Sequence, residues 1–397
     1  MEPLVLHSFT VASSLGAGLN ATLGALAEQR SGLLPCTFEH VNLNTYVGQV
    51  AGLEQLPVRD DLAEFDCRNH RLAQRGLRQD GFADAVAAVK EQYGPARIAV
   101  LLGTSTSGIL ETELAYQRRN PATGALPSDF RYASTHNHFA LPQFVQRYFG
   151  LCGPALAVST ACSSSAKVFG SAARMIAAGL CDAAIVGGVD SLCLTTLYGF
   201  NSLELVSPES CRPFDAQRGG ISIGEAAGFA LLKKAPAIRA PEQLLLLGVG
   251  ESSDAYHMST PHPEGLGAQL AMRRALQAAT LQPADIDYIN LHGTATRSND
   301  AAEDCAVYAV FGGKTACSST KGYTGHTLGA AGIIEAIICA LSLRHGFMPG
   351  TLNCQTPDPV LRCKLLLANE RRPLRRVLSN SFGFGGNNCS LIFGRGD

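Results

Sequence analysis

Strong net charge, a secretion signal and a membrane-length apolar run are all missing from this chain of 397 residues. Charged side chains make up 16% of it and the formal net charge is -1, so nucleic-acid binding, which usually needs a strongly basic face, has no support. The richest apolar stretch, Ile333 to Leu343, is interrupted by Glu335 and is shorter than the roughly 18 residues of a transmembrane helix. The N terminus has an acidic second residue, Glu2, and no basic segment. We therefore expect a cytoplasmic protein without a membrane span.

Closely spaced cysteines are also missing, although the chain contains 13 cysteines. The nearest two are Cys354 and Cys363, so a zinc site built on a Cys-x2-4-Cys spacing is excluded. A long chain without a secretion signal keeps its thiols reduced. We expect no metal site and no disulfide framework, with most cysteines, such as Cys181 and Cys339, serving as small core residues.

Complete phosphate-binding glycine loops are absent as well. Gly312 to Thr315 resembles the end of such a loop, but the first glycine that it requires would fall on Tyr308. The glycine pairs at 248–250 and 383–385 lack the third glycine of a dinucleotide fingerprint. The Gly-x-Ser-x-Gly at 220–224 follows a polar loop and precedes an apolar run, which favours a glycine hairpin over a hydrolase nucleophile. We expect no cofactor.

The chain does contain short apolar strands that alternate with Ala-rich amphipathic stretches. Ile98 to Leu102 and Ala183 to Val186 have the composition of buried strands. Asp66 to Val89 and Ser163 to Leu180 have the pattern of helices. Alternation of this kind predicts α/β layers.

Three features occur twice, in the same order, along the chain. A strand followed by a glycine turn recurs at 98–106 and 286–296, a loop followed by a helix at 158–179 and 318–343, and a glycine-rich hairpin at 218–228 and 381–388. We infer an internal duplication, joined near residues 234–243. The predicted halves are residues 1–238 and 239–397.

Cys162 lies directly ahead of an Ala-rich helical stretch. A thiol at a helix N terminus faces unpaired N–H groups, so we expect its thiolate to be favoured. Two histidines in glycine-rich contexts, His292 and His326, are suited to complete a catalytic set, and Gly383 to Gly386 is a backbone able to bring an N–H donor close. For Cys162 taken alone, a buried structural thiol is the alternative.

Several short motifs together carry a resemblance to a known family. They are Thr160–Ser164, Cys211–Asp215, His292–Thr296 with Asp300 and Glu303, Lys321–Gly332, and Asn380–Gly386. In this order and spacing they closely resemble the elongating β-ketoacyl-acyl-carrier-protein synthases with a Cys-His-His triad, through almost the whole chain. The resemblance implies the thiolase fold, in which two βαβαβαββ halves pack as a five-layer α-β-α-β-α sandwich. It places the nucleophile in the first half and both histidines in the second.

The resemblance implies a ping-pong decarboxylating condensation. Cys162 would take an acyl group from an acyl carrier protein, with its oxyanion held by the N–H groups of Cys162 and Phe384. His292 and His326, as neutral imidazoles donating through Nε2, would hold the thioester carbonyl of a malonyl carrier protein and stabilise the enolate left by loss of CO2. The product is a β-ketoacyl carrier protein.

Supporting residues follow from the same resemblance. Lys321 would lie beside His326 with Glu303 as its partner, since a buried lysine without an acid is costly. Independently of the resemblance, the apolar sequence around Glu335 predicts a buried hydrogen-bonding acid there. Three residues match positions that contact substrate: Thr294 and Thr296 on the phosphopantetheine arm, and Phe384, whose ring would shield the acyl-cysteine.

Departures from the family pattern concern the expected acyl pocket. Thr106 occupies a place that often carries an apolar residue limiting this pocket, and Ile221 stands where an aromatic residue is usual. Asn387 replaces the usual threonine after the last glycine pair. Our hypothesis is therefore a specialised fatty-acid, polyene or polyketide pathway.

Two other functions remain open. The chain could work only as the ketosynthase subunit of a heterodimer whose partner resembles an inactive chain-length factor. A degradative thiolase is less favoured, because that chemistry needs a second cysteine in the C-terminal glycine loop and Cys389 falls beyond it. The resemblance implies a dimer, either a homodimer or a heterodimer, and Arg118 to His138 is a candidate for its contact.

Overall fold

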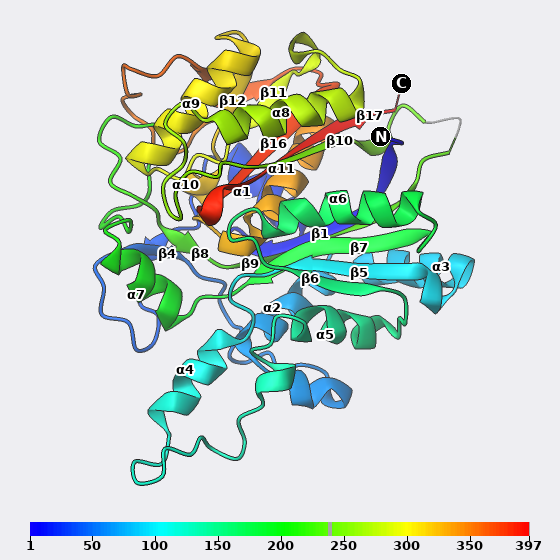
Figure 1. Cartoon of the computed structure of the whole chain (residues 1–397), viewed down its shortest axis with the longest axis vertical. Coiled ribbons are helices and arrows are strands. Elements are labelled where there is room, and N and C mark those ends of the chain that lie inside the picture. Colours follow the sequence, from blue (N-terminus) through cyan, green and yellow to red (C-terminus); the bar gives the residue numbers. More distant parts are fainter. Residues whose placement is uncertain (237–239, 397) are drawn as a thin grey trace.

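The computed structural model describes residues 1–236 and 240–396, and Figure 1 shows the whole chain. The predicted boundary between residues 238 and 239 lies outside the described residues. Two groups of strands form the centre, and helices lie above, between and below them in this view.

The first half contributes five strands, in the order β6-β5-β7-β9-β1, to a 12-stranded sheet, and β1 pairs antiparallel with β10 (Leu244–Ser253) of the second half. The five strands are called the first sheet below. Its strands are β1 (Leu4–Ser13), β5 (Ile98–Gly103), β6 (Ala155–Val158), β7 (Ala183–Asp190) and β9 (Ala226–Lys234). Strand β5 runs parallel to β6 and β7, whereas β9 runs antiparallel to β7 and β1. Both predicted strands, Ile98 to Leu102 and Ala183 to Val186, are confirmed inside β5 and β7.

The second half repeats this arrangement in the order β12-β11-β16-β17-β10, with β14 added beyond β12. Its strands are β10 (Leu244–Ser253), β11 (Tyr288–Asn290), β12 (Ala316–Ser318), β14 (Lys364–Leu365), β16 (Arg376–Gly383) and β17 (Asn387–Arg395). Directions match strand for strand. The register shifts between Leu6 and Ser8 in the first half and between Leu246 and Gly248 in the second, so even the irregularity is repeated. The predicted duplication is confirmed.

Helices complete five layers. Helices α2 (Arg68–Leu77), α3 (Phe82–Tyr93) and α5 (Ala140–Phe149) cover the outer face of the first sheet, and α8 (Leu266–Ala279) and α9 (Arg297–Phe311) cover that of the second. Helices α6 (Ser164–Ala177) and α11 (Ala331–His345) lie between the sheets in the largest apolar cluster. Along β5, Val100 packs outward and Leu101 inward, as expected for a parallel strand buried on both faces.

The two central helices approach closely where Gly332 meets Ala166. A Cβ on Gly332 would lie 2.6 Å from the Ala166 nitrogen, so a residue without a side chain is needed there. The stretch Leu328–His345 is long and apolar enough to cross a membrane by length and composition alone, but 89% of it is buried inside the protein. It is therefore the central core helix.

One predicted helix is wrong as a single element. Asp66 to Val89 forms α2 and α3, because Asp80 and Gly81 adopt left-handed backbone angles, with φ of 58° and 66°. The side chain of Asp80 accepts hydrogen bonds from the Leu19 N–H and the Thr10 hydroxyl, which holds this turn against β1. The predicted helix from Ser163 to Leu180 is confirmed as α6.

The remaining elements are short. They are α1 (Leu19–Ala27), α4 (Ile109–Gln117), α7 (Leu194–Ser202), α10 (Lys321–Thr324), β2 (Gly16–Ala17), β3 (Leu34–Pro35), β4 (Tyr46–Gly48), β8 (Ile223–Gly224), β13 (Phe347–Met348) and β15 (Glu370–Arg371). Helix α4 and the loop after it extend away from the layered body (Figure 1). This loop contains most of the segment from Arg118 to His138 that was considered for a dimer contact.

Candidate functional site

A cavity lies where the carboxyl ends of strands from both halves meet. Cys162 follows β6, His292 follows β11, and Phe384 follows β16, while His326 follows α10 after β12. All four residues line the cavity. In α/β sheets, ligands bind outside the carboxyl ends of the strands. The predicted triad is therefore assembled from both halves.

Cys162 is buried, with 6% of its surface exposed, and precedes the cap of α6 by one residue. Its Sγ lies 3.0 Å from His326 Nε2 and accepts a hydrogen bond from the Phe384 N–H. Burial raises the pKa of this thiol to about 12, although the charge of Lys321 and the Phe384 N–H act to lower it. The expectation of a favoured thiolate is wrong for the free protein, because desolvation outweighs the groups that lower the pKa of this thiol, Lys321 and the Phe384 N–H.

The loop from Gly383 to Phe384 approaches Cys162 through a residue without a side chain. A Cβ on Gly383 would lie 2.8 Å from the Thr160 carbonyl oxygen and 3.2 Å from the Cys162 nitrogen. Glycine lets this backbone come close enough to aim the next N–H, that of Phe384, at Sγ. This is the position that an oxyanion-hole donor needs.

Hydrogen bonds determine which ring nitrogen of His326 carries the proton. The Leu328 N–H donates to Nδ1 at 3.2 Å, and an N–H can only donate, so Nδ1 accepts and the proton is on Nε2. Leu328 holds this position with a left-handed φ of 53°. Burial, and then the charge of Lys321, lower the pKa of His326 well below its ordinary value, so the ring is neutral.

His292 is held in the same form by a different donor. The Lys321 ammonium lies 3.3 Å from its Nδ1 and also donates to its carbonyl oxygen. An ammonium has no acceptor, so Nδ1 accepts and Nε2 keeps the proton. Burial, Lys321 and His326 all lower the pKa of His292 well below its ordinary value. The two rings meet edge to face, with centroids 5.2 Å apart.

Lys321 does not have the neighbours predicted for it. Its ammonium is paired with Glu335 in α11, not with Glu303, and it contacts His292 rather than His326. Burial raises the pKa of Glu335 to about 7, with Lys321 opposing the shift. The view of Glu335 as a buried hydrogen-bonding acid is confirmed.

Glu303 supports the backbone that carries His292. Its two carboxylate oxygens accept the N–H groups of His292 and Gly293 at 2.8 and 2.7 Å. The Asn380 amide donates to it at 3.2 Å. The carboxylate that was expected to neutralise Lys321 is thus occupied in fixing the turn after β11.

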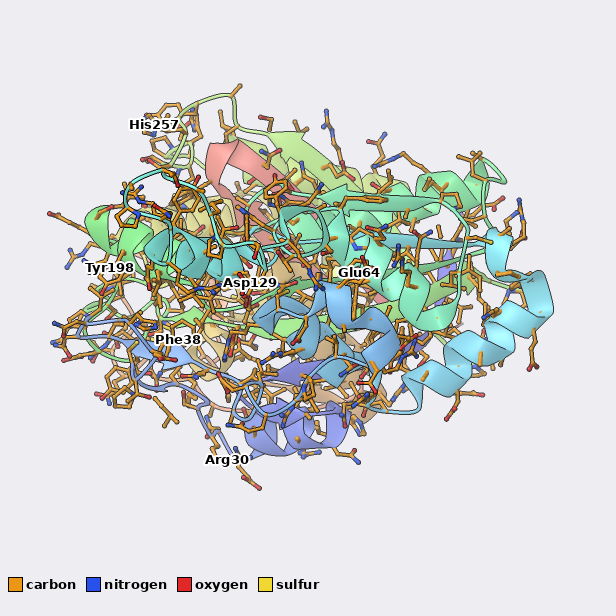
Figure 2. All side chains as sticks on the ribbon, turned by 90° about the horizontal axis from the view of Figure 1, so that it is seen from below. Arg30, Phe38, Glu64, Asp129, Tyr198 and His257 are labelled. Atoms are coloured by element: carbon orange, nitrogen blue, oxygen red, sulfur yellow. The ribbon has the colours of Figure 1, made fainter. Side chains whose placement is uncertain are left out.

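The cavity continues from the triad toward the surface. Thr294 and Thr296 line it, with their hydroxyls 2.9 Å apart, as does Ile221. The ring of Phe384 packs against that of Phe200 in α7, with the ring centroids 5.7 Å apart. The lining also includes a loop that runs from Asp254 to Pro261, and His257 on this loop lies at the edge of the molecule in Figure 2.

Thr106 has a different role from the one predicted. It is buried but does not line this cavity. Its hydroxyl and its N–H both donate to the carboxylate of Asp190, at 2.8 and 2.9 Å. The assignment of Thr106 as a substrate contact is not supported, because its polar groups are taken up by Asp190.

Among the described residues, one group has the spacing of metal ligands, namely Cys162, His292 and His326, whose ligand atoms lie within 4.8 Å of one another. A ligating histidine normally donates its other ring N–H to an acceptor. Here both Nδ1 atoms face donors, Leu328 N–H and Lys321, so each Nε2 carries a proton. This donor set does not fit a metal ion and instead suits hydrogen bonding to a substrate oxygen.

Sequence reasoning missed three parts of the site: the Leu328 N–H, Asp190, and the loop from Asp254 to Pro261. A backbone donor leaves no trace in residue identity. Asp190 had a weak signal, because it is a single acid at the end of the apolar run that starts at Ala183. The loop has no motif that points to a cavity.

Two family models match the chain: "Beta-ketoacyl synthase, N-terminal domain" over residues 63–237 and "Beta-ketoacyl synthase, C-terminal domain" over residues 245–355. The chain is similar to "3-oxoacyl-[acyl-carrier-protein] synthase 2" of Vibrio cholerae, with 32% identity over 99% of both chains. It is 42% identical to "3-oxoacyl-[acyl-carrier-protein] synthase, mitochondrial" of Arabidopsis thaliana over 63% of this chain and 58% of that protein.

A solved structure resembles the whole molecule. The ketosynthase ApeO in complex with its chain length factor ApeC, from Xenorhabdus doucetiae, superposes with a TM-score of 0.90 and 39% identity. The match covers 99% of this chain and 98% of that chain. The two similar halves and their layers are thus those of a known architecture.

Proposed function

Because the chain belongs to the β-ketoacyl synthase family, a family of acyltransferases that form carbon–carbon bonds, we propose how its residues divide the ketosynthase reaction. The fold is the thiolase fold of this family. The first half, residues 1–238, supplies the nucleophile Cys162. The second half, residues 239–397, supplies the two imidazoles and their supporting groups.

In the first half-reaction the Cys162 sulfur attacks the thioester carbon of an acyl carrier protein. The C–S bond to the carrier breaks, and the thiol proton leaves with the carrier sulfur. The oxyanion of the tetrahedral intermediate forms beside Sγ, at which the Phe384 N–H is directed, and this N–H and that of Cys162 are assigned as its two donors. Since burial raises the pKa of this thiol to about 12, the proton leaves as the sulfur attacks rather than beforehand.

In the second half-reaction a malonyl carrier protein binds with its thioester oxygen between His292 Nε2–H and His326 Nε2–H. Loss of CO2 leaves an enolate whose negative oxygen both donors stabilise. The enolate carbon then attacks the acyl-Cys162 carbonyl carbon, a C–C bond forms, and the Cys162 sulfur leaves and takes up a proton. Neutral imidazoles suit this step because each ring has its single N–H at Nε2, where it can donate a hydrogen bond to the developing oxyanion.

The observation that carries this proposal is the matched protonation of the two rings, each fixed by a donor at Nδ1. Intact-mass analysis after mixing the protein with acyl carrier thioesters tests the nucleophile. We expect an acyl adduct on the wild type and none on Cys162→Ala. An adduct that persists in Cys162→Ala, with the protein still folded by circular dichroism, would refute the assignment.

The thiolase alternative has a specific obstacle. Cys389, the cysteine that follows the glycine loop in the sequence, is fully buried in β17 and belongs to the central apolar cluster, so it is not available to the cavity. We therefore assign the direction of the reaction as condensation.

We propose a pair of macromolecular partners: an acyl carrier protein that delivers acyl and malonyl groups on phosphopantetheine, and a second ketosynthase-like subunit. Thr294 and Thr296, which line the cavity, are assigned to the arm. The similarity to a ketosynthase solved with its chain length factor supports a heterodimer, and a homodimer is the alternative. Native mass spectrometry of the chain co-expressed with the ketosynthase-like product of a neighbouring gene decides between them, since a 1:1 complex excludes a pure homodimer.

The acyl group is proposed to belong to a specialised fatty-acid, polyene or polyketide pathway. Ile221, which lines the cavity in place of the usual aromatic residue, supports this proposal, whereas Thr106 does not. A panel of acyl carrier thioesters measures the preference, and faster loading of plain saturated medium chains than of unsaturated ones would overturn it. The cytoplasmic location expected from the sequence remains a prediction that cell fractionation tests.

A further inference from the structure

Asp190 is a fully buried carboxylate that the reaction described above does not use. It is the last residue of β7, and within the described residues no lysine, arginine or histidine forms a salt bridge with it. Its neighbours are all hydrogen-bond donors. That is the arrangement which an ionised carboxylate, an acceptor without a proton to give, requires.

Five of these donors come from the turn after β5, in the first half of the molecule. The Thr104 hydroxyl donates at 2.8 Å, the Ser105 N–H and hydroxyl at 2.8 and 2.5 Å, and the Thr106 N–H and hydroxyl at 2.9 and 2.8 Å. A buried anion with this many donors is rigidly held, because moving it would leave several groups without partners.

The sixth donor comes from the second half. The N–H of Gly329 donates to Asp190 Oδ2 at 2.5 Å. Residue 329 has to be glycine for this contact, since a Cβ there would lie 2.7 Å from that oxygen and 2.8 Å from the Ser105 nitrogen. Asp190 therefore joins a rigid turn of the first half to the chain just after His326.

Leu328, which directly precedes Gly329, is the residue whose N–H bonds to Nδ1 of the His326 ring. It has a left-handed φ of 53°, which costs a residue with a side chain about 1–2 kcal/mol, so the turn needs an external anchor to persist. The backbone of His326 itself is held separately, by hydrogen bonds with Ser222 and Gly224. Asp190 holds the Leu328–Gly329 peptide, and the adjoining Thr327–Leu328 peptide carries the N–H that bonds to the imidazole. Within the turn itself, the Ala330 N–H donates to the Thr327 carbonyl oxygen at 3.0 Å.

We propose that Asp190 is a positioning residue for decarboxylation: by holding Gly329, it keeps the Leu328 N–H on His326 Nδ1 and the ring proton on Nε2. This inference rests on the proposed role of His326. It assigns the carboxylate to the malonyl half-reaction and not to loading of Cys162. Asp190 also lies close enough for its charge to disfavour the Cys162 thiolate, so removing that charge does not slow loading.

Asp190→Asn tests the proposal, with Asp182→Asn as the matched control. Asp182 directly precedes the other end of the same strand, where it pairs with Arg97 near the surface. For Asp190→Asn we expect the kcat of malonyl carrier decarboxylation to fall roughly 10- to 100-fold, the size of effect expected from a misplaced catalytic group, with a smaller change in KM. Acylation of Cys162 stays at or above the wild-type rate. The control variant retains both rates.

A readout that needs no substrate keeps this test separate from the proposed function. Nitrogen-15 NMR of histidine-labelled protein, assigned through His326→Gln, reports the tautomer of the ring. We expect the Nε2–H form in the wild type and a mixture of tautomers in Asp190→Asn. A pure Nε2–H form in the variant overturns the inference, whether or not the wild type decarboxylates malonyl groups.

Gly329→Ala is a second variant that tests the same contact, and it tests the proposal by itself if Asp190→Asn does not fold. Its added methyl pushes the turn away from Asp190 without changing any charge. We expect the same selective loss of decarboxylation. Unchanged decarboxylation in either folded variant, or an equal loss in both half-reactions, would refute a positioning role.

Discussion

The two halves of the molecule have the same strand order, the same strand directions and the same register shift, yet they present different chemistry at equivalent places. In the first half, Cys162 lies between β6 and α6. The equivalent connection of the second half, between β12 and α11, contains the short helix α10, so Lys321 and His326 both precede α11. In the proposed mechanism, similar backbones thus supply a nucleophile from one half and hydrogen-bond donors from the other.

The helices that follow also differ. Residues 331–343 of α11 are all buried, whereas α6 has exposed residues such as Arg174 and Ala177. Both turns ahead of the central helices contain a left-handed residue with a side chain, Ala161 with φ 52° and Leu328 with φ 53°. The backbone turn is therefore common to both halves, whereas the side chain near it differs, being Cys162 in the first half and His326 in the second.

The largest expected effects come from replacing Cys162 of the first half or His326 of the second, because each variant should block a different step. Cys162→Ala should abolish condensation, by at least about 10³-fold, while malonyl decarboxylation persists because both imidazoles remain. His326→Ala should do the reverse: decarboxylation falls by about 10²- to 10⁴-fold and acyl loading of Cys162 continues. Release of labelled CO2 and intact-mass analysis measure the two steps. Loss of both steps in both variants would mean that the halves do not act separately.

The next largest effect is expected from breaking the buried ion pair between Lys321 and Glu335. Lys321→Met leaves Glu335 buried without its cation and should cost about 3–5 kcal/mol of unfolding free energy, measured by urea denaturation. The double variant Lys321→Met/Glu335→Leu should recover most of this stability, because neither charge then remains buried. Its decarboxylation should stay impaired, since His292 Nδ1 has lost its donor. Full recovery of activity in the double variant would contradict the role assigned to Lys321.

Glu303 gives the second half a distinct dependence on pH. Burial raises the pKa of its carboxyl from 4.5 to about 7, so between these values the folded state binds more protons than the unfolded state. The stabilisation is fully present below pH 4.5 and is lost as pH rises through 7, a change of about 3 kcal/mol. Urea unfolding at pH 5 and pH 8 should show a larger loss of stability in the wild type than in Glu303→Gln, which keeps only the similar contribution of Glu335. The exposed Glu91→Gln serves as control, and an identical pH dependence in all three proteins would disprove the assignment.

The smallest effect concerns the contact between the two central helices. Gly332→Ala should destabilise the protein by about 1–3 kcal/mol, because the added methyl meets the backbone of Ala166. Gly199→Ala, in α7, adds the same methyl where nothing lies within 4 Å, and should stabilise by about 0.5–1 kcal/mol. Thermal unfolding compares them. Equal shifts in both variants would show that the helices do not depend on close contact.

Much of this arrangement could be predicted from the sequence because it depends on pattern and on short motifs. The alternation of apolar runs predicted the layers, and the repeated order of features predicted the duplication. Cys162, His292 and His326 were identified because their motifs are short and local. Their meeting in one cavity follows from the strand ends on which they lie.

What the sequence could not predict depends on the direction of individual side chains. Glu303 and Glu335 are both acids in helices, and only their positions in three dimensions show that Glu335 contacts Lys321. Thr106 was expected to face the substrate, but Asp190 draws its hydroxyl away. The effect of desolvation on the Cys162 thiol likewise requires knowledge of what surrounds it.

The pairing of the first strand of each half with its last has a consequence for synthesis on the ribosome. Strand β1 finds its long partner only when β9 has been made, since Leu4 pairs with Lys234. At about 5–20 residues per second, β1 therefore waits for tens of seconds or less with an unpaired edge. Strand β10 waits in turn for β17, where Leu244 pairs with Arg395. The nascent chain thus passes through two successive intervals in which an apolar strand is open to wrong partners, and a chaperone that acts early would protect the first of them.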